Sequence, residues 1–348
     1  MSNSDVQLIA LAREDVSINC CGACDATTSD VRYQLSPEQL KAIDAVPGFR
    51  DGPYGFLEPI GTLAYFQKKY VACLSALRNL NELTVADCGS GYGWNALALG
   101  LGGAKRVLGF DFNPQAVQVA NGLARALRVD DRVEFRHASI TELPLEPLSV
   151  DAFFCIETLE HLFGKAPQAL REVARATRDV ILVTTPNKWF PMIAHDTRLP
   201  FAHWLPKGLR DVYARALRRE EDNENNVFVS PREIIRGLRD FRLTSRFLGF
   251  PSFSEYAKIY PHYLPYMGRR KSMTRDLRGS KRAGYRVLAG FGGQACFHLL
   301  PSLTGIFRRA VGPPRESRRS AVPAIVVSFP ITATSFMQGA GRFHSADS

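Results

Sequence analysis

The chain has 348 residues, of which 45% are hydrophobic, and this is enough to form a packed core in one large domain or in two. The net charge of +10 is local, because residues 261–320 hold thirteen Lys and Arg against only Asp276 and Glu316. Composition therefore excludes a mainly disordered chain, and the positive excess must be explained by what this one segment contacts.

The seven cysteines are scattered along the chain, and two of them, Cys88 and Cys155, fall in predicted core strands. An odd, scattered set of cysteines favours a reducing compartment. The N-terminus shows no basic region followed by a long apolar run, so no secretory signal is expected. The cytoplasm is the expected location, and residues 1–35 are expected to form a flexible lead-in.

The first predicted helix begins at Ser36, because Ser36-Pro37-Glu38-Gln39 supplies an N-cap, an N1 proline and a capping-box Gln. Residues 61–80 have the apolar spacing of a long amphipathic helix. These helices open the predicted main domain, residues 36–253.

Residues 83–101, LTVADCGSGYGWNALALGL, predict a buried strand, a tight turn and a helix. Gly89, Gly91 and Gly93 let the backbone turn sharply and approach a ligand closely. At the carboxyl end of a parallel strand, such a loop and the following helix N-terminus present backbone N–H groups. The stretch therefore predicts a site for a nucleotide-like cofactor.

Two acids narrow the choice of cofactor. Asp87 precedes a GxGxG loop rather than the GxGxxG of dinucleotide sites, and its charge would repel a pyrophosphate but suit a cation. Asp111 ends the second predicted strand, about 20 residues past the glycines, where a carboxylate takes a ribose diol. A nucleoside that carries a positive charge suggests S-adenosylmethionine.

The segments DCGSGYG (87–93) and GFDFNPQAV (109–117) resemble the first two motifs of the class I S-adenosylmethionine-dependent methyltransferases, over about residues 60–253. The resemblance implies a doubly wound, mostly parallel seven-stranded sheet and methyl transfer from S-adenosylmethionine. The family usually places an Asp after the third strand, where this chain reads His137-Ala138-Ser139. The expected cofactor residues are Asp87, Gly89, Ser90, Gly91, Gly93, Asp111, Phe112, Ser139 and Cys155.

The remaining elements follow the alternating order of such a sheet. Asn113-Pro114 begins a helix that runs to about Leu127, and a further helix is expected at about 165–177. Further strands are predicted at 132–137, 150–155, 179–185, 241–249 and, as the last strand, 323–330. Between and after them lie a predicted cap (186–229), an insertion (254–322) and a tail (331–348).

Glu157, Glu160 and His161 follow the fourth predicted strand, at the cofactor edge of the sheet. Their i, i+3, i+4 spacing would place all three on one helical face, and His161 is the first choice as general base, with Glu157 and Glu160 beside it. ExxEH resembles motifs of small-RNA 2′-O-methyltransferases and ubiquinone-pathway O-methyltransferases, which implies Mg²⁺ or Mn²⁺. The implied ligands are Glu157, Glu160, His161, His195 and His203; in the alternative, His161 acts as a base or caps a helix without a metal.

The segment Val287–Phe307 carries no charge, but its glycines and Pro301 argue against a membrane-spanning helix. An interfacial segment on anionic lipid, at the inner face of the membrane, is expected within 261–320, with a lid on the core as the alternative. The expected activity is O-methylation of a small-molecule, glycan or lipid-linked acceptor. The alternatives are an RNA 2′-O-methyltransferase, for which no RRM, KH or OB signature is seen, and a non-catalytic S-adenosylmethionine-binding protein.

Overall fold

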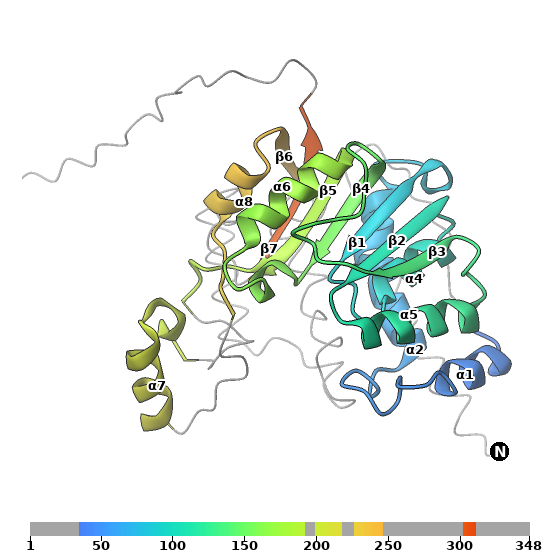
Figure 1. The fold of residues 1–348 in the computed structure, drawn as a ribbon, viewed down its shortest axis with the longest axis horizontal. Helices are drawn as coiled ribbons and strands as arrows, with labels where there is room; N and C mark the ends of the chain where they lie inside the picture. The colour runs from blue at the N-terminus through green and yellow to red at the C-terminus, as the bar shows by residue number, and fades with distance from the viewer. Residues whose placement is uncertain (1–34, 192–198, 218–225, 246–301, 311–348) are drawn as a thin grey trace, which may run out of the picture. The chain divides into compact units, whose positions relative to one another are not determined.

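The computed structural model of the chain describes residues 35–191, 199–217, 226–245 and 302–310. Seven strands form one sheet in the order β3-β2-β1-β4-β5-β7-β6 (Figure 1). The first five are parallel to their neighbours, whereas β7 runs antiparallel to both β5 and β6. The predicted doubly wound, mostly parallel seven-stranded sheet is confirmed.

The strands are β1 (Thr84–Cys88), β2 (Arg106–Asp111), β3 (Val133–His137), β4 (Val150–Ile156), β5 (Thr177–Pro186), β6 (Phe241–Ser245) and β7 (Ser302–Arg309). The described α-helices are α1 (Pro37–Asp44), α2 (Pro59–Phe66), α3 (Ala72–Ser75), α4 (Trp94–Leu101), α5 (Pro114–Leu127), α6 (Ala166–Ala176), α7 (Lys207–Ala216) and α8 (Pro231–Gly237). Shorter turns are the π-helix η2 (Gln67–Val71) and the 3-10 helices η3 (Leu80–Glu82), η4 (Leu159–His161) and η5 (Ala202–Trp204).

Local capping fixes where several helices begin. Ser36 and Gln39 form a reciprocal capping box at α1, and Ser230 and Glu233 form another at α8, as the sequence predicts. The side chain of Asn113 accepts the N–H groups of two residues in the first turn of α5. The predicted helix at 61–80 begins at Pro59 and is interrupted by the π-turn η2 before it ends at Ser75.

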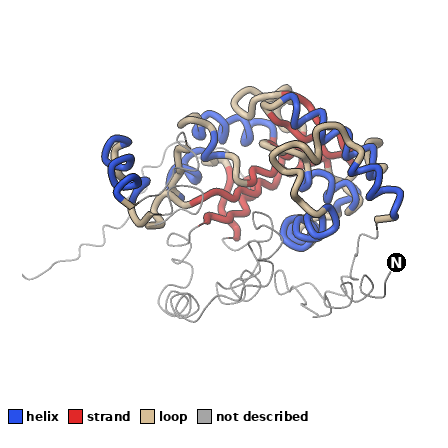
Figure 2. Tube along the Cα trace, turned by 90° about the horizontal axis from the view of Figure 1, so that it is seen from below, coloured by secondary structure: helices blue, strands red, loops and turns tan. Residues whose placement is uncertain are grey.

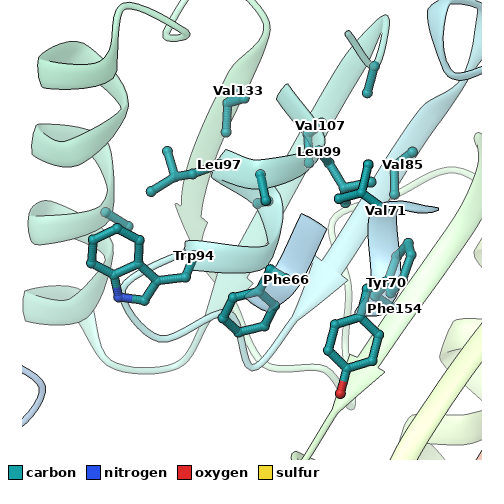
Figure 3. Packing of buried hydrophobic residues seen from close by; sticks show 14 of the residues in the cluster. Phe66, Tyr70, Val71, Val85, Trp94, Leu97, Leu99, Val107, Val133 and Phe154 are labelled. Atoms are coloured by element: carbon teal, nitrogen blue, oxygen red, sulfur yellow. The ribbon is translucent and has the colours of Figure 1, made fainter. Parts of the chain in front are cut away.

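Two hydrophobic clusters cover the two faces of the sheet. The larger one joins β1, β2 and β3 to helices α2, α4 and α5, and Figure 3 shows Trp94, Leu97 and Leu99 of α4 packed against it. The second cluster joins the sheet to α6 and α8. The sheet is therefore a middle layer between helices, as the two views in Figures 1 and 2 show.

The position of the last strand corrects the sequence prediction. β7 is Ser302–Arg309, inside the predicted insertion 254–322 and at the end of the uncharged stretch 287–307, and it takes the place assigned to 323–330. Leu303, Ile306 and Phe307 are buried, since the strand lies between two others. Residues 323–330 lie outside the described part of the chain, and no described helix is long and apolar enough to span a membrane.

Candidate active site

The glycine loop after β1 is tied to the end of β2. The N–H groups of Gly89 and Ser90 donate to the carbonyl oxygen of Phe110 at 2.8 and 3.1 Å, and the N–H of Gly91 donates to Asp111 Oδ2 at 2.7 Å. These bonds hold the loop at the carboxyl edge of the parallel strands, where open α/β sheets bind their ligands.

The three glycines of this loop serve different ends, although all have positive φ. A Cβ on Gly89 would lie 2.4 Å from Thr158 Oγ1, and one on Gly93 would lie 2.2 Å from the ring of Phe135, so both are required by close packing. A Cβ on Gly91 would meet no atom of the described residues within 4 Å. Gly91 is therefore the glycine whose backbone faces open space.

Asp87 is nearly fully buried at the end of β1. Burial raises the pKa of its carboxyl group to about 7, and the charge of Asp111 adds to the rise, while Asn95 and the backbone of Ala96 oppose it. A carboxyl group poised in this way is readily ionised by a nearby positive charge. It suits a cationic ligand better than an anionic one.

Asp111 is held by two backbone groups, one on each carboxylate oxygen. Oδ2 accepts from Gly91 and Oδ1 accepts from the N–H of Asn113 at 2.9 Å. Each oxygen keeps a further lone pair for a hydroxyl donor. The ring of the next residue, Phe112, is 72% exposed beside it, which provides an apolar surface at the same edge.

Ser139 and Cys155, the other two predicted cofactor residues, differ in their exposure. Ser139 is exposed just past β3, where its hydroxyl contacts Thr141 Oγ1 at 2.8 Å and accepts the N–H of Thr141. The side chain of Cys155 is fully buried in the core cluster with α6, so it does not reach the open edge. Burial also raises the pKa of the Cys155 thiol. A role for Ser139 stays a prediction, and only the backbone of Cys155 could serve.

The loop fits S-adenosylmethionine on two observations. Ser90 Oγ is buried without a hydrogen-bond partner among the described residues, and the backbone at Gly91 faces free space. An unsatisfied buried hydroxyl is unusual in a finished structure and is expected to bind a ligand or water. With Asp111 for the ribose and Asp87 for a cation, the residues present fit the cofactor.

The turn that holds Glu157, Glu160 and His161 is not the α-helix that their spacing predicts. Glu157 has φ of 47°, and residues 159–161 form a single 3-10 turn. Thr158 fixes this turn against the glycine loop, because its Oγ1 lies 3.0 Å from the carbonyl oxygen of Cys88 and 2.9 Å from that of Ile156. The three side chains therefore do not share one helical face.

Glu160 is 2% exposed and accepts a hydrogen bond from the Thr185 hydroxyl at 2.9 Å. Burial raises its pKa well above the usual value, and the neighbouring Glu157 raises it further. Burial therefore favours the neutral form of Glu160. Glu157 Oε1 accepts from the hydroxyl of Ser302 at 3.4 Å, which brings the start of β7 into the site.

His161 has a side chain that is 47% exposed, and its Nδ1 lies 2.9 Å from Asn226 Oδ1. An amide oxygen can only accept, so Nδ1 carries a hydrogen, and in the neutral ring the lone pair is then on Nε2. Nε2 lies 3.9 Å from Glu160 Oε1. The neutral tautomer therefore leaves a basic nitrogen on the side away from Asn226.

Lys69 is a site residue that sequence reasoning missed. Its ammonium donates to Tyr65 Oη at 2.9 Å and lies 4.8 Å from the centre of the Tyr70 ring. Burial lowers its pKa well below the usual value, and the charge of Glu157 opposes the drop. The available signal was a lysine among the apolar positions of the helix, and the residue lies in the π-turn η2, a feature frequent at functional sites.

The predicted metal site is not assembled by the part of the chain that the structure describes, which holds no group of three or more His, Cys, Asp or Glu able to bind an ion. His203 Nε2 donates instead to the carbonyl oxygen of Lys188 at 2.9 Å, and its ring packs edge-on against Phe228. His195 lies outside the described residues. In the described part of the chain, Glu157, Glu160 and His161 contact Ser302, Thr185 and Asn226, respectively.

A hollow of about 530 Å³ lies at the opposite edge of the sheet, between the amino ends of β4 and β5 and the end of β7. Among its lining residues, Arg178 pairs with Asp151 and Arg78 pairs with Asp179. It is remote from the glycine loop and takes no part in the site.

Comparison with known proteins agrees with this geometry. Residues 86–180 match the model of a methyltransferase domain family. A probable S-adenosylmethionine-dependent methyltransferase of Mycolicibacterium smegmatis is 40% identical over 123 residues, covering 34% of this chain and 44% of that protein. The 27-O-demethylrifamycin SV methyltransferase of Amycolatopsis mediterranei is 32% identical over 108 residues, covering 29% and 39%. The chain thus spans less than half the length of these relatives.

Among solved structures, magnesium protoporphyrin IX methyltransferase of Synechocystis PCC 6803 with bound S-adenosylhomocysteine is similar at 14% identity and a TM-score of 0.43, covering 72% of this chain and 84% of that one. The sheet order and the glycine loop define a Rossmann-like nucleotide-binding domain. The family match covers residues 86–180, and this segment, from β1 into β5, contains the glycine loop and the turn after β4.

Proposed function

We propose that the protein is an S-adenosylmethionine-dependent O-methyltransferase that acts on a small-molecule, glycan or lipid-linked acceptor. The observation that carries the proposal is the contact between the glycine loop and the turn after β4, where Thr158 lies against Gly89. This contact brings the residues suited to the cofactor next to Glu160 and His161, which are suited to acid–base chemistry.

The reaction needs an acceptor placed in line with the methyl group and a base for its proton. S-adenosylmethionine supplies an electrophilic methyl group on a sulfonium. His161 takes the acceptor proton at Nε2, and the imidazolium formed is stabilised by Asn226 at Nδ1 and by the carboxyl oxygens of Glu160. Glu160 is held in place beside the imidazole by the hydroxyl of Thr185, and burial favours its neutral form.

An oxygen acceptor is favoured because an amine acceptor, once deprotonated, is nucleophilic without such a base, whereas a hydroxyl gains most from proton removal. The name of the Amycolatopsis relative, a 27-O-demethylrifamycin SV methyltransferase, supports a small organic acceptor. The predicted interfacial role of residues 261–320 falls mostly outside the described chain and stays a prediction.

The experiment is methyl transfer from labelled S-adenosylmethionine to cell extracts, followed by fractionation into lipid, saccharide, small-molecule, protein and RNA pools. Label in the lipid, saccharide or small-molecule pool supports the proposal, whereas label confined to RNA or to protein contradicts it. His161→Ala should reduce turnover by ~10²–10⁴-fold with little change in cofactor affinity. Asp111→Ala should instead weaken cofactor binding in calorimetry, and an active His161→Ala protein would exclude the proposed base.

A further inference from the structure

Asn226 lies in a short segment that joins two loops at the carboxyl edge of the sheet. The next residue, Val227, donates its N–H to the carbonyl oxygen of Glu160 at 2.9 Å, in the turn after β4. Two residues further on, the carbonyl oxygen of Val229 accepts the N–H of Lys188 at 3.1 Å, in the loop after β5. These two backbone bonds fix the segment beside the turn that carries the proposed base.

The side-chain amide of Asn226 has a partner at one end only. Its Oδ1 lies 2.9 Å from Nδ1 of His161. Its Nδ2 is buried and has no hydrogen-bond partner among the residues that the structure describes. Leaving a buried donor unpaired is costly, and folded proteins keep few such groups. This N–H donor, next to the proposed base, is therefore expected to meet a molecule that binds there.

We propose that Asn226 is a positioning residue that acts on both the base and the acceptor of the methyl transfer. Its Oδ1 accepts the hydrogen of His161 Nδ1, which keeps the lone pair of the neutral ring on Nε2. Its Nδ2 donates a hydrogen bond to an oxygen of the bound acceptor. This inference rests on the proposed function, in which His161 is the base, and adds which part of the acceptor is recognised.

The oxygen that Nδ2 binds is a different one from the oxygen that is methylated. A hydrogen bond donated to the reacting oxygen would hold back the electron pair that attacks the methyl group. Because Oδ1 and Nδ2 belong to one planar amide, and Oδ1 contacts the base, the second oxygen lies near the reacting hydroxyl. The acceptor is therefore a molecule whose methylated hydroxyl has a neighbouring hydroxyl, ether or carbonyl oxygen, as in a sugar.

The first test observes the ring of His161 in the full-length protein made with isotope-labelled histidine. Long-range proton–nitrogen NMR spectra, recorded where the ring is neutral, show which nitrogen carries the hydrogen, and His161→Ala identifies the signals. We expect the hydrogen on Nδ1 in the unmodified protein and in Asn226→Asp, whose carboxylate still accepts it. In Asn226→Leu most of the population should carry it on Nε2, because the oxygen that holds the Nδ1 hydrogen is gone.

The second test concerns the acceptor and uses labelled S-adenosylmethionine with the extract pool that takes up the label. Asn226→Asp keeps an oxygen for His161 but loses the Nδ2 donor. The amount of pool that half-saturates this variant, at its own pH optimum, should rise about tenfold, while the maximal rate changes less. Mass spectrometry of the labelled product should place the new methyl ether next to a second oxygen.

Asn79→Leu is the matched control, because Asn79 is an exposed residue before η3, at the amino edge of the sheet. It should leave the spectrum of His161 and both kinetic quantities unchanged. Three results would each overturn the inference: the His161 hydrogen on Nδ1 in Asn226→Leu, an unchanged half-saturating amount in Asn226→Asp, or a methyl group on an isolated hydroxyl. An active His161→Ala protein would overturn the proposed base and this inference with it, whereas the three results above overturn the inference alone.

Discussion

Asp87 is the residue whose environment most directly predicts a pH dependence. Its pKa of about 7 lies above the value of an Asp in an unfolded chain, so its contribution to stability is complete below about pH 4 and is lost as the pH rises through 7. In the protein without ligand, ionising it costs up to about 4 kcal/mol. A cationic ligand next to Asp87 would instead favour the ionised form of its carboxyl group.

We therefore expect the affinity for S-adenosylmethionine to rise between about pH 5 and pH 7.5 as Asp87 ionises. Calorimetric titrations across this range measure it. Asp87→Asn should bind more weakly at the upper end and should lose most of the pH dependence. A variant with the same pH profile as the unmodified protein would show that Asp87 does not face the positive charge.

Gly91 and Gly93 form a matched pair for separating ligand binding from folding. Gly93→Ala should lower the melting temperature strongly, because its Cβ would overlap the ring of Phe135 in addition to the strain of positive φ. Gly91→Ala should cost only the backbone strain, about 1–2 kcal/mol, since its Cβ meets open space.

The cofactor affinity of Gly91→Ala should fall much more than its stability, since the added methyl group projects toward the expected ligand. Thermal melts with and without S-adenosylmethionine report both quantities. If Gly91→Ala is stabilised by the ligand as much as the unmodified protein, the open space beside the loop is not the cofactor site.

At the scale of single residues, the site residues that could be predicted are those marked by a pattern in the neighbouring sequence. The glycines, Asp87 and Asp111 follow from the order of strand, turn and helix, which depends on neighbouring residues only. Ser302, Asn226 and Lys69 could not be found in this way, because each reaches the site from a distant segment. Glu157 and Ser302 are separated by 145 positions in the chain. The ExxEH spacing misled because a positive φ at Glu157 breaks the assumed helix.

At the scale of elements, six strands were predicted close to their observed positions, since each combines an apolar run with a turn signal. The last strand was placed at 323–330 because that segment is apolar and contains β-branched residues. Tertiary contacts select Ser302–Arg309 as the last strand. Arg308 donates to Asp179 at 2.9 Å, and Gly305 leaves room for Phe307 and Leu243, whose atoms would lie 2.7 and 3.2 Å from a Cβ there.

The central place of β7 predicts the outcome of truncation. A chain that ends at Pro301 should fail to fold cooperatively, because β5 and β6 would both lose the partner that joins them. A chain that ends at Val311 should fold, since residues up to 311 form one compact unit. Circular dichroism melts of the two chains decide between these outcomes, and a cooperative melt of the shorter chain would contradict the prediction.

At the scale of the whole molecule, the fold class followed from the sequence because alternating strands and helices with short connections admit few arrangements. The cap prediction for 186–229 remains a prediction as a cover for the site. Its described ends do touch the site, since Asn226 binds His161 and the N–H of Val227 donates to the carbonyl oxygen of Glu160. The burial of polar side chains at the candidate site could not be predicted from the sequence, because it depends on which segments of the folded chain pack against one another.

The antiparallel course of β7 has a consequence for synthesis. A ribosome releases β1 to β5 and the whole cofactor loop well before Ser302 emerges, yet Glu157 and the open side of β5 find their partners only then. During that interval the edge of β5 in the nascent chain is unpaired, and side chains that are buried in the folded protein are exposed. Such an edge can pair with other chains. Nascent chains of this protein are thus expected to need chaperone protection in the interval between the emergence of β5 and that of β7.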